Sequence, residues 1–207
     1  MPFVTYQIPV GGFDSNFSYL ILGENGDAAL VDPTGDAELI RAELNRHETV
    51  IPRYILLTHG HLDHVQALGE ILEVFPGEII AHPNNQEAGK KRLRDGEKIP
   101  FGGEDSFIEA LFTPGHSRDS VCYRLSDDSG LFTGDVLFIG CIGFCRSREM
   151  FNSLQKKILP QSGKLMVYSG HDYGPVPYRS LEEERQQNPF LNCTDLEEFK
   201  KLLQKLE

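Results

Sequence analysis

The sequence has few cysteines and no long apolar run, and both absences restrict what the protein can be. Its 207 residues include four cysteines with no Cys-x-x-Cys pair. They are too few for a disulfide scaffold, so reduced thiols in a reducing compartment are expected. No apolar run approaches the roughly 18 residues of a membrane span, and the first residues lack the pattern of a secretory signal. We therefore expect a cytoplasmic protein with no membrane partner.

Basic residues are also scarce. The chain has 20 Lys and Arg against 31 Asp and Glu, for a net charge of −11. Phosphate-backbone binding needs a basic face, so this balance argues against a nucleic-acid partner and favours a small-molecule substrate. A 40% hydrophobic and 25% charged composition without repeats is typical of a globular protein, and we predict a single domain over residues 1–207. The oligomeric state is left open.

Histidines are concentrated in one segment, 58–64, which has the sequence Thr-His-Gly-His-Leu-Asp-His. The apolar residues 54–57 before it are typical of a buried strand, and apolar residues recur at helical spacing after it. A strand-to-helix turn can direct side chains two and five residues apart into one cavity. Neutral imidazoles suit zinc, iron or manganese, and the carboxylate supplies negative charge that two adjacent cations need. The segment therefore predicts a metal site.

Three more candidate ligands follow apolar, strand-like runs. They end the segments Thr113-Pro-Gly-His116, Thr133-Gly-Asp135 and Ser169-Gly-His171. A single strand-end His or Asp is more often a turn residue, but three of them together with the histidine segment favour one shared site. Folds with a rigid sheet commonly carry such ligands on loops at one edge.

These motifs, with an early Val31-Asp-Pro33, occur in an order that resembles the metallo-β-lactamase superfamily and, within it, the glyoxalase II-like hydrolases. The resemblance covers nearly the whole chain. It implies an α+β fold, the αββα four-layer sandwich, in which two mixed β-sheets pack face to face and are flanked by helices. It also implies a binuclear site with one metal on His59, His61 and His116, the second on Asp63, His64 and His171, and Asp135 as the bridge.

The chemistry that the resemblance implies is hydrolysis. Two divalent ions, zinc in the first place with Fe²⁺ or Mn²⁺ as alternatives, would activate water as hydroxide and polarise a carbonyl. Asp63 and Asp135 would orient the nucleophile as well as bind metal. The glyoxalase II-like resemblance implies a thioester substrate such as a hydroxyacylglutathione. For Asp32 two interpretations stay open: a carboxylate that supports a metal ligand, as in the family, or an Asp-Pro turn.

Glyoxalase II proteins hold glutathione with a larger C-terminal helical domain, whereas this chain ends soon after His171. Most of that binding surface is therefore expected to be absent. The remaining pocket is expected near residues 138–146 and 173–179, and the candidate substrate contacts are Arg146, Tyr173 and Arg179.

Other functions remain open. Residues 171–174, 182–185 and 188–189 resemble the C-terminal stretch of persulfide dioxygenases, which implies one iron on His59, His116 and Asp135 with open positions for oxygen. The superfamily also includes lactone and β-lactam hydrolases. A non-catalytic metal-binding domain is disfavoured, because structural zinc sites are usually rich in cysteine and no candidate ligand here is a cysteine.

Periodicity and turn signals also predict the secondary structure. Strands are expected at residues 4–10, 17–22, 28–32, 54–57, 78–81, 106–112, 131–132 and 165–168. Helices are expected at residues 36–47, 62–73, 84–93, 147–159, 181–187 and 194–206.

Overall fold

Strand β2 (Asn16–Leu22) shows why the sheets of this chain are covered on both faces. Phe17, Tyr19 and Ile21 lie on one face of the strand, whereas Leu20 lies on the other, and all four are buried. Alternate side chains of a strand point to opposite faces, so a strand that is apolar at consecutive positions must be covered on both sides. The structure, a computed structural model, describes residues 2–89, 91 and 93–205.

The strands form two mixed sheets. In the first, β1, β2 and β3 are antiparallel, and β3, β4 and β5 are parallel. Its spatial order is β1 (Val4–Gly11), β2, β3 (Asp27–Val31), β4 (Ile51–Leu56) and β5 (Glu78–Ile80). In the second sheet only β9 and β10 are parallel neighbours. Its order is β11 (Arg179–Ser180), β10 (Met166–Ser169), β9 (Gly130–Gly134), β8 (Val121–Leu125), β7 (Phe107–Phe112) and β6 (Glu97–Pro100).

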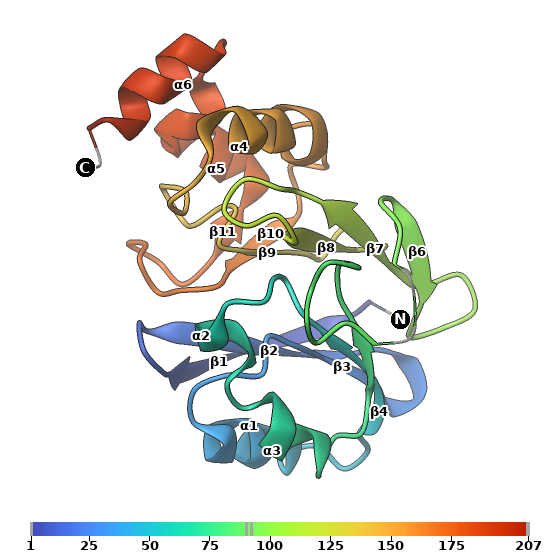
Figure 1. Ribbon diagram of the computed structural model, residues 1–207. Coiled ribbons are helices and arrows are strands. Elements are labelled where there is room, and N and C mark those ends of the chain that lie inside the picture. Colours follow the sequence, from blue (N-terminus) through green and yellow to red (C-terminus); the bar gives the residue numbers. More distant parts are fainter. Residues whose placement is uncertain (1, 90, 92, 206–207) are drawn as a thin grey trace.

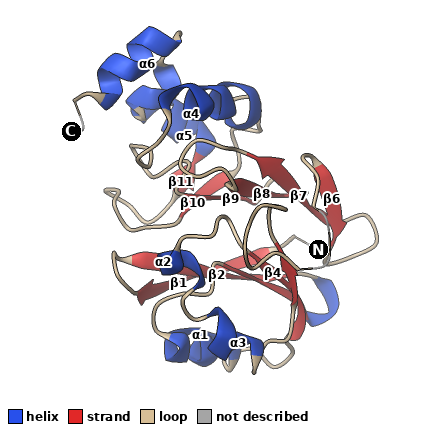
Figure 2. Ribbon diagram, in the orientation of Figure 1, coloured by secondary structure: helices blue, strands red, loops and turns tan. Residues whose placement is uncertain are grey.

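Helices cover the outer face of each sheet (Figures 1 and 2). On the first sheet lie α1 (Ala37–Leu44) and α3 (Leu68–Leu72), and the short α2 (Leu62–Val65) precedes α3. On the second sheet lie α4 (Ser147–Ser153), continued by a π-helical turn (Leu154–Ile158), and α5 (Leu181–Gln187). Helix α6 (Leu196–Leu203) packs on α4, farther from the sheet (Figure 1). Short 3₁₀ turns occur at Glu24–Gly26 and Pro189–Asn192.

Three buried apolar clusters fill the spaces between these layers: one between the sheets and one under each set of helices. The expected αββα sandwich is therefore confirmed. No helix in the described part of the chain combines the length and the apolar character needed to cross a bilayer.

Two predicted helices differ in the structure. The one expected at 62–73 is interrupted, because Ala67 has ψ near 0° and donates its N–H to the carbonyl of Pro33. The helix expected at 84–93 is wrong, since the described residues of this segment form turns. There, side chains of His82 and Asn85 accept hydrogen bonds from nearby backbone N–H groups, which competes with helix formation. Residues 90 and 92 lie outside the described part.

Candidate metal centre

All seven predicted ligands lie in one cluster at an edge of the sandwich. They fall into three overlapping groups, in each of which the candidate ligand atoms lie within 4.8 Å of one another. The groups are His59, His61 and His116; Asp63, His64 and His171; and His59, His64 and Asp135. The structure thus brings together the two three-residue sets and the aspartate that the family resemblance implies, and their role as metal ligands stays a prediction.

The cluster draws on both sheets, because its members follow β4, β7, β9 and β10. The bridge between Asn16 and His171 joins the first sheet to the second at this point. Gly170 is required here: a Cβ at this position would lie 2.5 Å from Asp135 Oδ1 and 2.7 Å from His64 Cε1. A larger residue would therefore fill the space between the candidate ligands.

The first group consists of three imidazoles. His61 Nδ1 lies 3.0 Å from His59 Nε2 and 2.9 Å from His116 Nε2. Two ligand atoms about 2.1 Å from one zinc ion at a tetrahedral angle are about 3.4 Å apart. The nitrogens are therefore spaced closely enough to share one ion.

The second group is even nearer to that spacing. His64 Nε2 lies 3.3 Å from His171 Nε2 and 3.5 Å from Asp63 Oδ2, and His171 Nε2 lies 3.4 Å from the same Asp63 oxygen. Asn16, which is 1% exposed, donates its amide to Asp63 Oδ2 at 3.3 Å. Asn16 is not among the residues predicted from the sequence; the available signal was a polar residue at the start of a buried strand.

Backbone carbonyls orient two of the histidines. Nδ1 of His116 lies 2.9 Å from the carbonyl oxygen of Phe144, and Nδ1 of His171 lies 2.7 Å from that of Asp14. A carbonyl only accepts, so each Nδ1 must carry the proton. Each Nε2 then presents a lone pair to the cluster, which is the tautomer that a metal ligand needs.

Asp32 orients two further histidines, His64 directly and His59 through Thr58. Its Oδ2 lies 2.9 Å from His64 Nδ1 and accepts from Thr58 Oγ at 2.6 Å, while its Oδ1 accepts from the Thr58 N–H at 2.7 Å. Because the Thr58 hydroxyl donates its proton to Asp32, its oxygen is left to accept a hydrogen bond from His59 Nδ1, 3.1 Å away. Asp32 holds this position with a φ of 45°, in the left-handed region that non-glycine residues seldom adopt. Of the two interpretations left open, this geometry supports the ligand-supporting carboxylate.

Asp135 lies between the groups. Its Oδ2 is 3.5 Å from His116 Nε2 and 3.3 Å from His171 Nε2, and its Oδ1 is 3.2 Å from His64 Nε2. Oδ1 is buried, and its contact with His64 Nε2 lacks the alignment of a hydrogen bond. A buried carboxylate oxygen without a donor is costly, and a cation shared by the groups would relieve that cost.

The carboxylates of the cluster favour a positive charge at His64, as the direction of its pKa shift shows. Burial alone would lower the pKa of His64, but its contacts with Asp135 and Asp32 outweigh burial and raise that pKa to about 10. Burial alone would raise the pKa of Asp135, but close contacts with His171 and His64 hold it well below its usual range. For His59 and His116 burial dominates and lowers the pKa. A divalent cation bound in the cluster would supply the positive charge that these carboxylates favour.

The three predicted substrate contacts lie in different surroundings. Tyr173 stacks on the His171 ring, with centroids 4.8 Å apart, and Arg146 is exposed at the start of α4. Arg179 is only 8% exposed, and its guanidinium forms an ion pair with Glu184 at 3.0 Å. The assignment of Arg179 as a substrate contact therefore needs correction, because its charge is used inside the fold.

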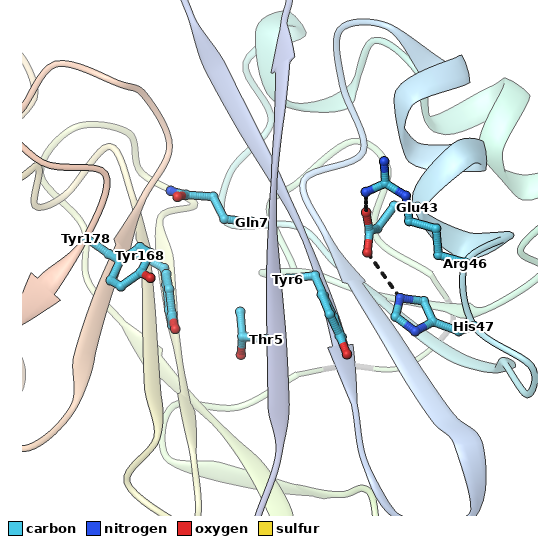
Figure 3. Close-up of a pocket in the computed structure, with 8 residues that line it drawn as sticks. All are labelled: Thr5, Tyr6, Gln7, Glu43, Arg46, His47, Tyr168 and Tyr178. Atoms are coloured by element: carbon cyan, nitrogen blue, oxygen red, sulfur yellow. Dashed lines mark hydrogen bonds and ion pairs between the residues drawn. The ribbon is translucent and has the colours of Figure 1, made fainter.

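Two histidines lie outside the cluster. His47 Nε2 lies 3.1 Å from Glu43 Oε1 and its ring packs on Tyr6, beside β1, where a separate depression of about 550 Å³ opens (Figure 3). His82 packs on Phe112, with ring centroids 4.3 Å apart. Both have structural partners, so the candidate centre uses five of the seven histidines.

We expect Asp32→Asn to weaken metal binding by about 10- to 100-fold, as is common for residues that orient metal ligands. The single oxygen of an amide cannot accept from the Thr58 N–H, the Thr58 hydroxyl and His64 together. Titration of metal-free protein with zinc against a competing chelator measures the change. Asp36→Asn is the matched control, because Asp36 caps α1 outside the cluster and Asn is an equally good cap. Equal zinc affinities in both variants would refute the role of Asp32.

Comparison with known proteins places this cluster in a family context. A family model described as "Metallo-beta-lactamase superfamily" matches residues 11–171. That range includes all seven candidate ligands and the supporting Asp32.

Individual relatives point to more than one activity. The chain is 30% identical to the probable polyketide biosynthesis zinc-dependent hydrolase BaeB of Bacillus velezensis, over 89% of this chain and 85% of that protein. It is 30% identical to the hydroxyacylglutathione hydrolase GloC of Haemophilus influenzae, over 89% of this chain and 96% of that protein. Among solved structures, ETHE1 from Myxococcus xanthus aligns with a TM-score of 0.83 and 27% identity, covering all of this chain and 92% of the other.

Proposed function

The chain belongs to the metallo-β-lactamase superfamily, and we propose that it is a binuclear metallohydrolase that cleaves a thioester such as a hydroxyacylglutathione. The observation that carries the proposal is the pair of three-residue ligand groups with the buried Asp135 between them. Such a paired arrangement suits two adjacent divalent ions, and the nitrogen and oxygen ligands favour zinc, with Fe²⁺ or Mn²⁺ as alternatives.

Two ions held by these residues would supply a water molecule of lowered pKa and would polarise a carbonyl. The protein's own contribution is orientation. Asp32 and the carbonyls of Asp14 and Phe144 fix the tautomers of four histidines before substrate arrives. Asp135 and Asp63 face the same space and would accept the hydrogen bonds that orient the attacking water.

A thioester is favoured over an amide on chemical grounds, because a thiolate leaves without the proton that an amide nitrogen requires. The similarity to a hydroxyacylglutathione hydrolase supports the same substrate class. We also propose that the enzyme acts in the cytoplasm. In support, burial raises the pKa values of its four free cysteines, as expected for inert reduced thiols.

A second candidate is a persulfide dioxygenase that uses a single iron on His59, His116 and Asp135. The chain is 32% identical to the mitochondrial persulfide dioxygenase ETHE1 of Homo sapiens, over 90% of this chain and 75% of that protein, and this similarity favours the second candidate. His116 and Asp135 lie within 3.5 Å of each other, and His59 joins Asp135 in one candidate ligand group, so this smaller set is also brought together. The full ligand set is compatible with both activities.

Metal content and turnover, measured together, distinguish these functions. We expect protein purified without added metal to contain about two zinc ions per chain and to release thiol from S-lactoylglutathione. One iron per chain with oxygen uptake on glutathione persulfide would identify the dioxygenase instead. Stable metal binding without turnover of either substrate would support a non-catalytic metal-binding domain.

A further inference from the structure

A polar depression of about 400 Å³ opens directly beside the candidate metal centre. One of its lining residues is His61, a member of the first ligand group. The lining residues are Gly60, His61, Asn84, Gln86, Arg118 and Asp119. An arm attached to a scissile carbonyl at the centre could therefore extend into this depression.

The wall of the depression is held by buried contacts. Asn85 is 6% exposed and donates its amide to Asp119 Oδ2 at 3.0 Å, while its own oxygen accepts from the N–H of Glu87 at 2.9 Å. Gly60 packs against the same pair, since a Cβ there would lie 3.1 Å from both Asn85 Nδ2 and Asp119 Oδ2. The loop of residues 82–87 is thus fixed to the ligand-bearing segment, and the depression has a defined shape.

Arg118 supplies an available positive charge. It is exposed, and its guanidinium forms no ion pair or hydrogen bond with any residue that the structure describes. The two other arginines considered for substrate binding differ: Arg146 lies 3.8 Å from Glu149, and Arg179 is paired with Glu184. Asp119 is the one acidic residue in the lining, and one of its oxygens is occupied by Asn85.

Two other side chains that line the depression, Asn84 and Gln86, can form hydrogen bonds with the amide groups of a ligand. The side chains of Asn84 and Gln86 are exposed and offer both donors and acceptors to a ligand. A chain with a net charge of −11 repels anionic ligands at long range, so recognition of an anion needs a local cation. Arg118 meets this need, and its planar guanidinium can bind a carboxylate or phosphate with two hydrogen bonds.

We propose that this depression is the subsite for an amide-containing arm that ends in an anion, with Arg118 as the group that pairs with that anion. The inference rests on the proposed hydrolysis of a thioester at the metal centre. The shared chemistry is that of a thiol attached to amide groups and a terminal carboxylate or phosphate. A peptidyl thiol such as glutathione and a phosphopantetheine arm both have it.

Kinetics with paired charged and neutral substrates test the subsite. We expect Arg118→Ala to lower kcat/KM for S-lactoylglutathione or lactoyl-phosphopantetheine by about 10- to 100-fold, the effect of losing a charge-assisted hydrogen bond. The esterified glutathione thioester and the phosphate-free pantetheine thioester should change less than about twofold, because they lack the anion. If the charge-dependent loss occurs with the glutathione thioesters, the arm is a peptidyl thiol. If it occurs with the pantetheine thioesters, the arm is a phosphopantetheine. Arg118→Lys should restore part of the loss.

Arg53→Ala is the matched control, since Arg53 is an exposed arginine on β4 whose partner, Asp27, lies on β3. It removes the same charge and should leave kcat/KM unchanged for every substrate. If Arg118→Ala lowers kcat/KM equally for charged and neutral substrates, or lowers it for neither charged substrate, the subsite proposal is overturned.

A binding measurement separates the subsite from the proposed function. S-methylglutathione and phosphopantetheine cannot be hydrolysed as thioesters, and their binding to the metal-loaded protein is measured by calorimetry. If no thioester is turned over but binding of either probe still depends on Arg118, the hydrolase proposal fails and the subsite stands. If thioesters are turned over with no dependence of rate or binding on Arg118, the subsite fails and the hydrolase stands.

Discussion

We expect Asp135→Ala to lose bound metal and catalytic activity together. Asp135 is 8% exposed and its two oxygens lie within 3.5 Å of His64, His116 and His171, so it is the carboxylate that contacts both ligand groups. The substitution would remove the ligand proposed to be common to two metal ions, and we expect activity to fall by about a thousandfold or more. Metal content by elemental analysis and turnover of the thioester measure the two effects.

The same variant must be shown to fold. Circular dichroism of metal-free wild-type and Asp135→Ala protein provides that comparison, and Asp105→Ala, at an exposed turn position, serves as the control substitution. Retention of two metals with normal turnover in Asp135→Ala would remove Asp135 from the centre. Retention of metal with lost turnover would limit its role to orienting the reactants.

The largest stability effect is expected for Glu184→Ala. Glu184 is fully buried and pairs with Arg179 at 3.0 Å; it also accepts from the Gly140 N–H at 3.0 Å and from the Asn188 amide at 3.0 Å. Removing one partner of a buried ion pair leaves the other charge uncompensated, which costs about 3–5 kcal/mol of unfolding free energy. Urea unfolding of the metal-free protein measures it.

Glu182→Ala is the matched control on the same helix, because the Glu182 side chain is 58% exposed and its partners, Arg185 and Gln186, lie three and four residues on. Exposed pairs of this kind contribute about 0–1 kcal/mol, so the control should unfold close to wild type. If the two variants lose equal stability, the Arg179–Glu184 pair has no special role in the fold.

Glu184 also has a consequence for the candidate centre. With Asn188, which donates to the Cys141 carbonyl at 3.0 Å, it fixes the loop that follows Asp135. That loop carries the Phe144 carbonyl that orients His116. Glu184 belongs to the α5 segment that resembles persulfide dioxygenases, so support of this loop gives that residue a role that does not by itself favour either enzyme.

The sequence by itself determined the fold class and the location of the candidate centre. Alternating or continuous apolar runs predicted the strands, because burial of one or both faces requires that pattern. The ligand residues could be recognised because metal chemistry needs particular side chains, and these stand at the ends of those runs. The helix at 84–93 was predicted wrongly, because side-chain hydrogen bonds of His82 and Asn85 hold the backbone in turns.

Only the tertiary structure decided what each polar side chain faces. Arg118 and Arg179 are indistinguishable as sequence letters, yet one is exposed beside His61 and the other is buried against Glu184. Asp32 supports His64, 32 positions away, through a backbone conformation that no local pattern predicts. The physical reason is common to these cases: the pairing of a charge depends on long-range packing, whereas periodicity and residue chemistry are properties of the local chain.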